Sequence, residues 1–145
     1  MHYLFLVDRR PIDPPPIVQL QPPKDSGLGY LHNPYFFLYA TLMDAKGEND
    51  LPFFNGNRTT AGAVVQSLHK LKDTNNKDGG FFIFADISIR LEGFYKLKFT
   101  MFEIAGTHVY RLCSVLSDTF QVYSPKCFPG MSGKRNNNNK KKDGV

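Results

Sequence analysis

The two adjacent arginines near the start of the chain are the residues best suited to binding an anion. Arg9 and Arg10 stand directly before a proline-rich segment that ends in Pro14–Pro16. Proline restricts the backbone, so a cation on such an arm loses less entropy when it meets a phosphate. The planar guanidinium group can also donate two hydrogen bonds to the edge of a guanine. This arrangement indicates binding to a polyanion.

Several lysines add to this basic character. Lys70 and Lys72 share a face if their segment is a strand, and Lys96 and Lys98 share a face of a later segment, because side chains alternate along a strand. Lys126 lies beside a proline-containing turn near the end of the chain. Such groups can hold the phosphates of a nucleic-acid backbone. A solvated, charged strand face is the more ordinary interpretation, so the lysines alone do not decide the function.

Catalytic chemistry has little support in the sequence. The four histidines and two cysteines lack the spacing of metal ligands, and no Gly-x-Ser-x-Gly pattern occurs. Asp86, Glu92 and Glu103 lie on or beside expected strands, where carboxylates are usually solvated or form turns. Cys113 and Cys127 either form one disulfide or stay as thiols. We therefore expect a protein that is not an enzyme and has neither a metal nor a cofactor.

The positive charge is concentrated at one end. The chain carries a net charge of +5 from 18 basic and 13 acidic residues, and residues 132–145 alone contribute +4. The rest of the chain is close to neutral, so its composition does not identify a nucleic-acid binder. The Asn/Lys-rich tail is expected to be disordered. Its basic residues form either a nuclear localisation patch or only a soluble end: Lys134, Arg135, Lys140, Lys141 and Lys142.

The hydrophobic pattern predicts antiparallel sheets. Within Asp78–Ile104, apolar and polar residues alternate over two stretches separated by a turn at Glu92-Gly93. A period of two is typical of strands with one buried face. Strands are expected at Met1–Val7, Ile17–Leu20, Tyr35–Met43, Ala61–Lys72, Phe81–Phe84, Ile87–Leu91, Tyr95–Ile104, Val109–Leu116 and Phe120–Tyr123. This number of short strands with long loops indicates an all-β sandwich over residues 1–131, followed by the tail at 132–145.

The pattern leaves two questions open. Ala61–Lys72 also has apolar residues at helical spacing, although its neighbours favour a strand. The runs Tyr35–Tyr39 and Phe81–Phe84 place large apolar side chains on both faces of their strands. Either a loop or the N-terminal segment covers the second face, or a partner chain does. In the second case, Phe82 and Phe84 are candidate interface residues.

The start of the chain is expected to be a strand. Met1–Val7 is apolar but lacks the preceding basic region and the following small-residue cleavage site of a signal peptide. No apolar run approaches the roughly 18 residues that a membrane helix needs. We therefore expect no membrane association. A secreted ligand-binding sandwich is a further alternative, and it would require cleavage of this segment.

Several blocks of the sequence, taken together, resemble the fungal velvet family of developmental regulators. The blocks are DRRPIDPPPIVQL at Asp8–Leu20, NPYFFLYATL at Asn33–Leu42, SLHKLKD at Ser67–Asp73, the long stretch Asp78–Glu103 and SPKCFPGM at Ser124–Met131. They span roughly residues 8–131. The resemblance implies an immunoglobulin-like sandwich similar to the Rel-homology fold. It also implies pairing with itself or another velvet protein, binding to double-stranded DNA, and a nuclear location with a cytoplasmic pool.

The resemblance further implies control of sporulation and secondary metabolism, in some members together with a methyltransferase partner. Arg9 and Arg10 match the end of the family's basic DNA-binding loop. Lys70, Lys72 and Lys126 would then hold phosphates. The upstream part of that loop departs from the family, and the N-terminal and C-terminal strands are expected to be shortened or missing. The alternative function is therefore a dimerisation or adaptor module that pairs with a velvet protein and does not bind DNA.

Overall fold

Nearly all of the regular secondary structure in the described part of the chain is β-strand. The computed structural model describes residues 4–7 and 15–123, with side chains for residues 15–123 only. The strands are β1 (Leu4–Val7), β2 (Ile17–Gln21), β3 (Phe36–Asp44), β4 (Phe53–Phe54), β5 (Asn57–Arg58), β6 (Thr60–Gly62), β7 (Val65–Ser67), β8 (His69–Lys72), β9 (Asp78–Ile83), β10 (Ile87–Ile89), β11 (Gly93–Ala105), β12 (His108–Leu116) and β13 (Phe120–Val122). A short 3-10 helix, η1 (Gly29–His32), lies between β2 and β3. No helix in these residues is long and apolar enough to cross a membrane.

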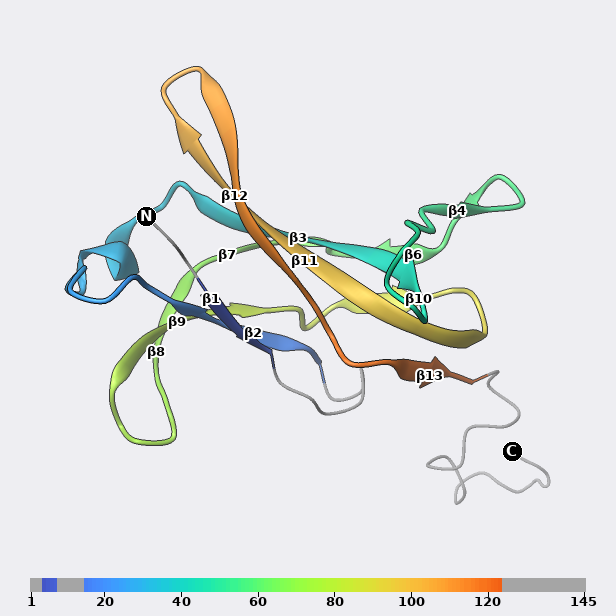
Figure 1. The fold of residues 1–145 in the computed structure, drawn as a ribbon, viewed down its shortest axis with the longest axis horizontal. Helices are drawn as coiled ribbons and strands as arrows, with labels where there is room; N and C mark the ends of the chain where they lie inside the picture. The colour runs from blue at the N-terminus through green and yellow to red at the C-terminus, as the bar shows by residue number, and fades with distance from the viewer. Residues whose placement is uncertain (1–3, 8–14, 124–145) are drawn as a thin grey trace.

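The strands form two main antiparallel sheets, which lie one over the other (Figure 1). The first sheet has the order β1-β2-β9-β8. The second has the order β12-β11-β3-β7, and β13 also pairs with β11. Two small pairs, β6 with β10 and β4 with β5, lie toward one end of the second sheet (Figure 1). The all-β sandwich predicted from the sequence is confirmed.

The core lies between the two sheets and is built from alternate residues of their strands. Its fully or nearly fully buried members are Val18 and Leu20 of β2, Phe36, Leu38, Ala40 and Leu42 of β3, Phe82 of β9, Phe84, and Tyr95, Leu97, Phe99 and Met101 of β11. Lys96 and Lys98 occupy the intervening positions of β11 and are only partly buried. The alternation predicted for this strand is therefore confirmed, because apolar side chains point inward and the lysines point outward.

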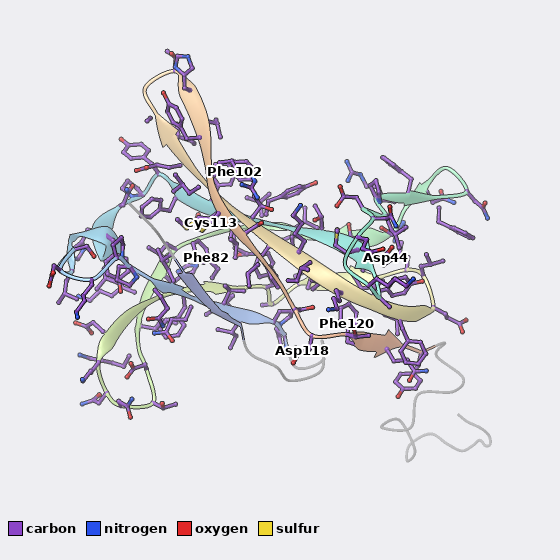
Figure 2. All side chains as sticks on the ribbon, in the orientation of Figure 1. Asp44, Phe82, Phe102, Cys113, Asp118 and Phe120 are labelled. Carbon is purple, nitrogen blue, oxygen red and sulfur yellow. The ribbon has the colours of Figure 1, made fainter. Side chains whose placement is uncertain are left out.

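Phe82 and Phe84 are core residues, so their prediction as interface residues is wrong. Neither side chain exposes any surface, and Phe82 lies inside the fold (Figure 2). The ring of Phe84 packs against Phe99 of the opposite sheet, with 5.3 Å between ring centroids. A side chain that is enclosed on all sides by its own fold cannot reach a partner chain.

The second faces of the two apolar runs are partly shielded within the described chain, although Tyr35 stays 55% exposed. On β3, the ring of Phe37 stacks on Phe102 of the neighbouring strand β11, with 5.2 Å between centroids. On β9, the ring of Phe81 lies over Gly79, where a Cβ atom would come within 3.1 Å of it. Cross-strand aromatic pairing and packing over a glycine shield these rings.

The structure differs from the predicted pattern in the segments between the long strands. Ala61–Lys72 does not form one strand but contributes to three, since β6, β7 and β8 each belong to a different sheet. The segment between the strands expected at Tyr35–Met43 and Ala61–Lys72 contains the β4–β5 hairpin, whose turn has left-handed backbone at Asn55 and Gly56. Local patterning cannot reveal such breaks, because the pairing partners lie far away in the sequence.

We predict that Phe84→Ala destabilises the fold itself. Truncating a buried phenylalanine removes apolar contacts and leaves a cavity, so the free energy of unfolding should fall by about 3–5 kcal/mol. Urea unfolding followed by circular dichroism measures this loss. Phe53→Ala is the control, because Phe53 is 59% exposed, and it should change stability little. Equal losses in both variants would contradict the assignment of Phe84 to the core.

Candidate nucleic-acid interface

The lysines predicted to hold phosphates lie on the hairpin formed by β8 and β9. The hairpin turn spans residues 73–77 and is organised by Asp73. The Asp73 carboxylate accepts hydrogen bonds from the backbone N–H groups of Asn75 at 2.8 Å and Lys77 at 2.9 Å. The Asp73 N–H donates to the Lys77 carbonyl at 2.8 Å. An aspartate that binds the backbone of its own turn in this way fixes the register of the two strands.

Lys70 and Lys72 share one face of β8, as predicted, and both meet the same carboxylate. Lys72 pairs in register with Asp78 of β9, and its Nζ lies 2.8 Å from Asp78 Oδ1. The Nζ of Lys70 lies 4.0 Å from Asp78 Oδ2. The hydrogen bond from Lys72, together with the charges of Lys72 and Lys70, lowers the pKa of Asp78 below its ordinary value.

This carboxylate reduces the positive charge that the hairpin offers to an anion. Lys70, Lys72 and Asp78 together carry one positive charge, although both ammonium groups remain largely accessible, with 47% and 60% of their side chains exposed. A phosphate that approaches the lysines must compete with Asp78 for them. The ion pairs with Asp78 would therefore make any phosphate binding here weaker than at two free lysines.

The other basic residues predicted for DNA binding lie outside the described residues. These are Arg9, Arg10 and Lys126, together with the proposed localisation residues Lys134, Arg135, Lys140, Lys141 and Lys142. Cys127 also lies outside. The predictions about these residues stay predictions.

The end of β1 and the start of β2 lie at the same end of the first sheet. Val7 of β1 pairs with Val18, and Ile17 of β2 pairs with Ile83 at the end of β9. The β8–β9 turn lies at the opposite end of β9, beyond Asp78. At about 3.4 Å per residue, the two ends of β9 are about 17 Å apart. The start of β2 and the β8–β9 turn therefore lie at opposite ends of the same sheet.

Arg58 and Arg90 form a second basic site that the sequence pattern does not indicate. Both arginines line one pocket beside the β4–β5 hairpin, although they are far apart in the chain. The pattern places Arg90 on the polar side of an expected strand and Arg58 in a long loop. Only the pairing of β6 with β10 brings them together, and no local signal reports that pairing.

The described residues offer little for other chemistry. Within residues 15–123, no group of three His, Cys, Asp or Glu side chains is placed to hold a metal ion. Cys113 on β12 is a free, partly buried thiol, and burial raises its pKa. A raised thiol pKa lowers the thiolate fraction and hence the reactivity of the cysteine at neutral pH.

Comparison with known proteins supports a regulatory family. The sequence model of the family described as "Velvet factor" matches residues 54–134. The chain is 49% identical to the spore development regulator VOSA of Pyricularia oryzae, over 86% of this chain and 25% of that protein. It is 45% identical to a velvet complex subunit of Chaetomium globosum, over 87% of this chain and 30% of that protein. It is 43% identical to the spore development regulator RYP2 of Ajellomyces capsulatus, over 86% of this chain and 33% of that protein. The chain thus spans about a quarter to a third of these relatives.

From the ion pairs of the β8–β9 hairpin we predict how the Asp78 carboxylate titrates. The pKa of Asp78 in the folded state is lowered. The ion pairs therefore contribute stability at pH values above the unfolded-state pKa of about 3.9. This contribution is lost as the pH falls through the folded-state pKa. Lys72→Met should raise the Asp78 pKa, because it removes the largest cause of the shift. Lys70→Met should raise it less. Carboxyl carbon chemical shifts recorded by NMR during an acid titration measure both effects, and an unchanged Asp78 titration in Lys72→Met would contradict this assignment.

Proposed function

Because the chain belongs to the velvet family, we propose that it is a regulator of fungal development, acting on spore formation and secondary metabolism. Relatives in Pyricularia oryzae and Ajellomyces capsulatus are named spore development regulators, which supports the first part of the proposal. Those relatives are longer than this chain. The proposal therefore concerns the part of such a regulator that the chain spans.

The biochemical activity that we propose is binding to double-stranded DNA, with Arg9 and Arg10 as the main contacts. The supporting observation is the first sheet, whose β1 and β2 flank these arginines and whose β8 presents Lys70 and Lys72 to solvent. The two ends of β9 in this sheet are about 17 Å apart. This distance corresponds to about five phosphates along one DNA strand. One duplex could therefore contact both ends of the sheet. Lys126 is a further proposed contact.

We also propose that the chain acts as a dimer with itself or with another velvet protein. One relative is named as part of a velvet complex. The tip of the β11–β12 hairpin projects from the body of the fold (Figure 1). It exposes Ile104 by 42% and its cross-strand neighbour Val109 by 58%. Exposed apolar residues on a projecting edge are typical of a protein interface. This hairpin replaces Phe82 and Phe84 as the proposed contact.

The cellular setting is a proposal that follows from the family resemblance. It comprises a nuclear location with a cytoplasmic pool, and association with a methyltransferase-containing complex. The basic residues after Gly133 would serve as the localisation patch. Tagging the chain with a fluorescent protein, with and without these residues, would test the location directly.

A non-DNA-binding adaptor is the second candidate function. Asp78 favours it, because this carboxylate engages both lysines of the hairpin. The near-neutral charge of the chain before its tail points the same way. An adaptor would need the β11–β12 surface but not the arginines. The two candidates therefore differ in which substitutions matter.

We predict that Arg9→Ala with Arg10→Ala weakens DNA binding by about 1–3 kcal/mol if these residues contact bases. Duplexes selected from a random pool provide the probe, and mobility shift over a salt series measures affinity for the chain alone and with a second velvet protein. Absence of any retarded band at low salt would reject DNA binding and leave the adaptor. Unchanged affinity in the double variant would reject these two contacts.

The mobility-shift assay can also test the lysines of the β8–β9 hairpin separately from the arginines. Asp78→Asn removes the carboxylate that competes for Lys70 and Lys72, so DNA binding should become about two- to fivefold tighter, the size of one exposed ion pair. Glu48→Gln changes the net charge equally on an exposed loop away from the hairpin and serves as the control. If both variants gain affinity to the same extent, the effect is one of overall charge and the hairpin is not a contact.

We predict that Val109→Asp weakens pairing while leaving the fold intact. A charge at a contact that becomes buried on association carries a desolvation penalty of several kcal/mol, so the dissociation constant should rise at least tenfold. Sedimentation equilibrium measures it, and circular dichroism confirms folding. Val65→Asp, at a 49% exposed position of β7, is the matched control. Unaltered pairing in Val109→Asp would remove this hairpin as the interface.

A further inference from the structure

A pocket beside the β4–β5 hairpin gathers two arginines in a lining that contains no carboxylate. Its volume is about 420 Å³, and its lining includes Arg58, Arg90, Phe54, Asn55 and Asn57. This volume falls in the range of about 300–1,000 Å³ that is usual for pockets that bind small molecules. No carboxylate belongs to the lining. The β4–β5 hairpin, which lines this pocket, lies at the opposite end of the molecule from the β8–β9 hairpin (Figure 1), so the pocket is distinct from Lys70 and Lys72.

The fold holds the backbones of both arginines in fixed positions. The N–H of Arg90 donates to the carbonyl of Thr59 at 2.7 Å, directly next to Arg58. Thr59 is 2% exposed, and its hydroxyl donates to the carbonyl of Leu51 at 2.5 Å. Next to this hydrogen bond, Ile89 pairs with Thr60 in the ladder between β6 and β10. The buried Thr59 and the β6–β10 pairing thus hold the two arginines at one site in the absence of a ligand.

The charges of these arginines are not neutralised within the described chain. Between residues 15 and 123, neither guanidinium forms an ion pair with a carboxylate. Arg58 lies over the ring of Phe53, with its Cζ 5.6 Å from the ring centroid, which leaves its N–H groups available. Two like charges that share a pocket repel each other. A bound anion would remove that repulsion and use the donors of both groups.

The chemistry of the lining selects a particular kind of anion. Guanidinium groups match the oxygen atoms of a phosphate and can bind them through paired hydrogen bonds. The side-chain amides of Asn55 and Asn57 supply further donors and acceptors. Phe54 is 53% exposed, and an exposed ring beside a phosphate site can stack on a nucleobase. A phosphate joined to a base would use all of these groups.

We propose that the Arg58–Arg90 pocket binds a nucleotide unit, with its phosphate on the two arginines and its base against Phe54. The unit comes either from a free nucleotide or from a single-stranded nucleic acid, which share this chemistry. Asn55 and Asn57 orient it. Binding at this pocket does not depend on the DNA contacts of the β1–β2–β9–β8 sheet.

The test uses adenosine 5′-monophosphate and a fluorescein-labelled oligothymidylate of ten residues as probes. Both are titrated at low salt into the whole chain, the first by isothermal calorimetry with NMR of the arginine side chains and the second by anisotropy. We expect saturable binding of at least one probe, with shifts of the Arg58 and Arg90 side-chain signals. Adenosine, which lacks the phosphate, should bind at least tenfold more weakly than the monophosphate.

Substitutions separate recognition from general charge. Arg58→Gln with Arg90→Gln should weaken binding at least tenfold, whereas Lys24→Gln with Lys46→Gln, which removes two charges at exposed positions, should have little effect. Arg58→Lys with Arg90→Lys keeps the charge but removes the planar fork, so it should lose most of the binding. Phe54→Leu should weaken the binding of the monophosphate but not that of inorganic phosphate.

The outcomes distinguish the two sources and the competing explanations. Arginine-dependent binding of the oligonucleotide identifies nucleic acid as the ligand, and binding of the monophosphate alone identifies a free nucleotide. Failure of both probes at millimolar concentration would overturn the proposal, as would equal losses in the arginine and lysine double variants. Asp78→Asn should leave this binding unchanged, so a failure here and a failure of duplex DNA binding are separate results.

Discussion

The pairing of β11 with β3 is the interaction on which the rest of this structure depends. The two strands stay in register from Tyr95 opposite Asp44 to Glu103 opposite Phe36, and their inward side chains supply much of the core. The other long strand, β12, and the short strand β13 attach to β11, whereas β7 attaches to β3. The first sheet closes over the same apolar face through Val18, Leu20 and Phe82. Because a shift of one residue would turn every core side chain toward solvent, the burial of this face fixes the register of the whole sandwich.

A stable sandwich leaves the connecting segments free to carry binding groups, as is common for scaffolds of this kind. The β8–β9 turn, the β4–β5 hairpin and the β11–β12 tip all project beyond the core, and each has a different character. The lysines beside the first are partly neutralised by Asp78, the second contributes Arg58 to a pocket whose lining has no carboxylate, and the third exposes the apolar side chains of Ile104 and Val109. The proposed binding to a nucleic acid and to a protein partner would use these surfaces of contrasting chemistry.

Electrostatics explains why overall charge is a poor guide to this molecule. Most of the net positive charge belongs to residues 132–145, while the charges that matter for a site are local. Lys70 and Lys72 look like a basic patch in the sequence, but they meet a carboxylate across the hairpin. Arg58 and Arg90 look unrelated in the sequence, but the fold places them together. Coulomb interactions depend on distance in space, so the order of charged residues along the chain cannot rank sites by their strength.

The sequence by itself determined the all-β class, the buried face of β11, and the long strands to within one or two residues, because period-two alternation is a local property of a chain with one face in a core. It also indicated the family, through several sequence blocks that resemble velvet proteins when taken together. Only the tertiary structure decided that Phe82 and Phe84 belong to the core, that residues 61–72 divide among three strands, and that Arg58 and Arg90 share a pocket. Each of these depends on which distant strands pair and which faces meet, and pairing between residues far apart in the chain leaves no periodic signal in either segment.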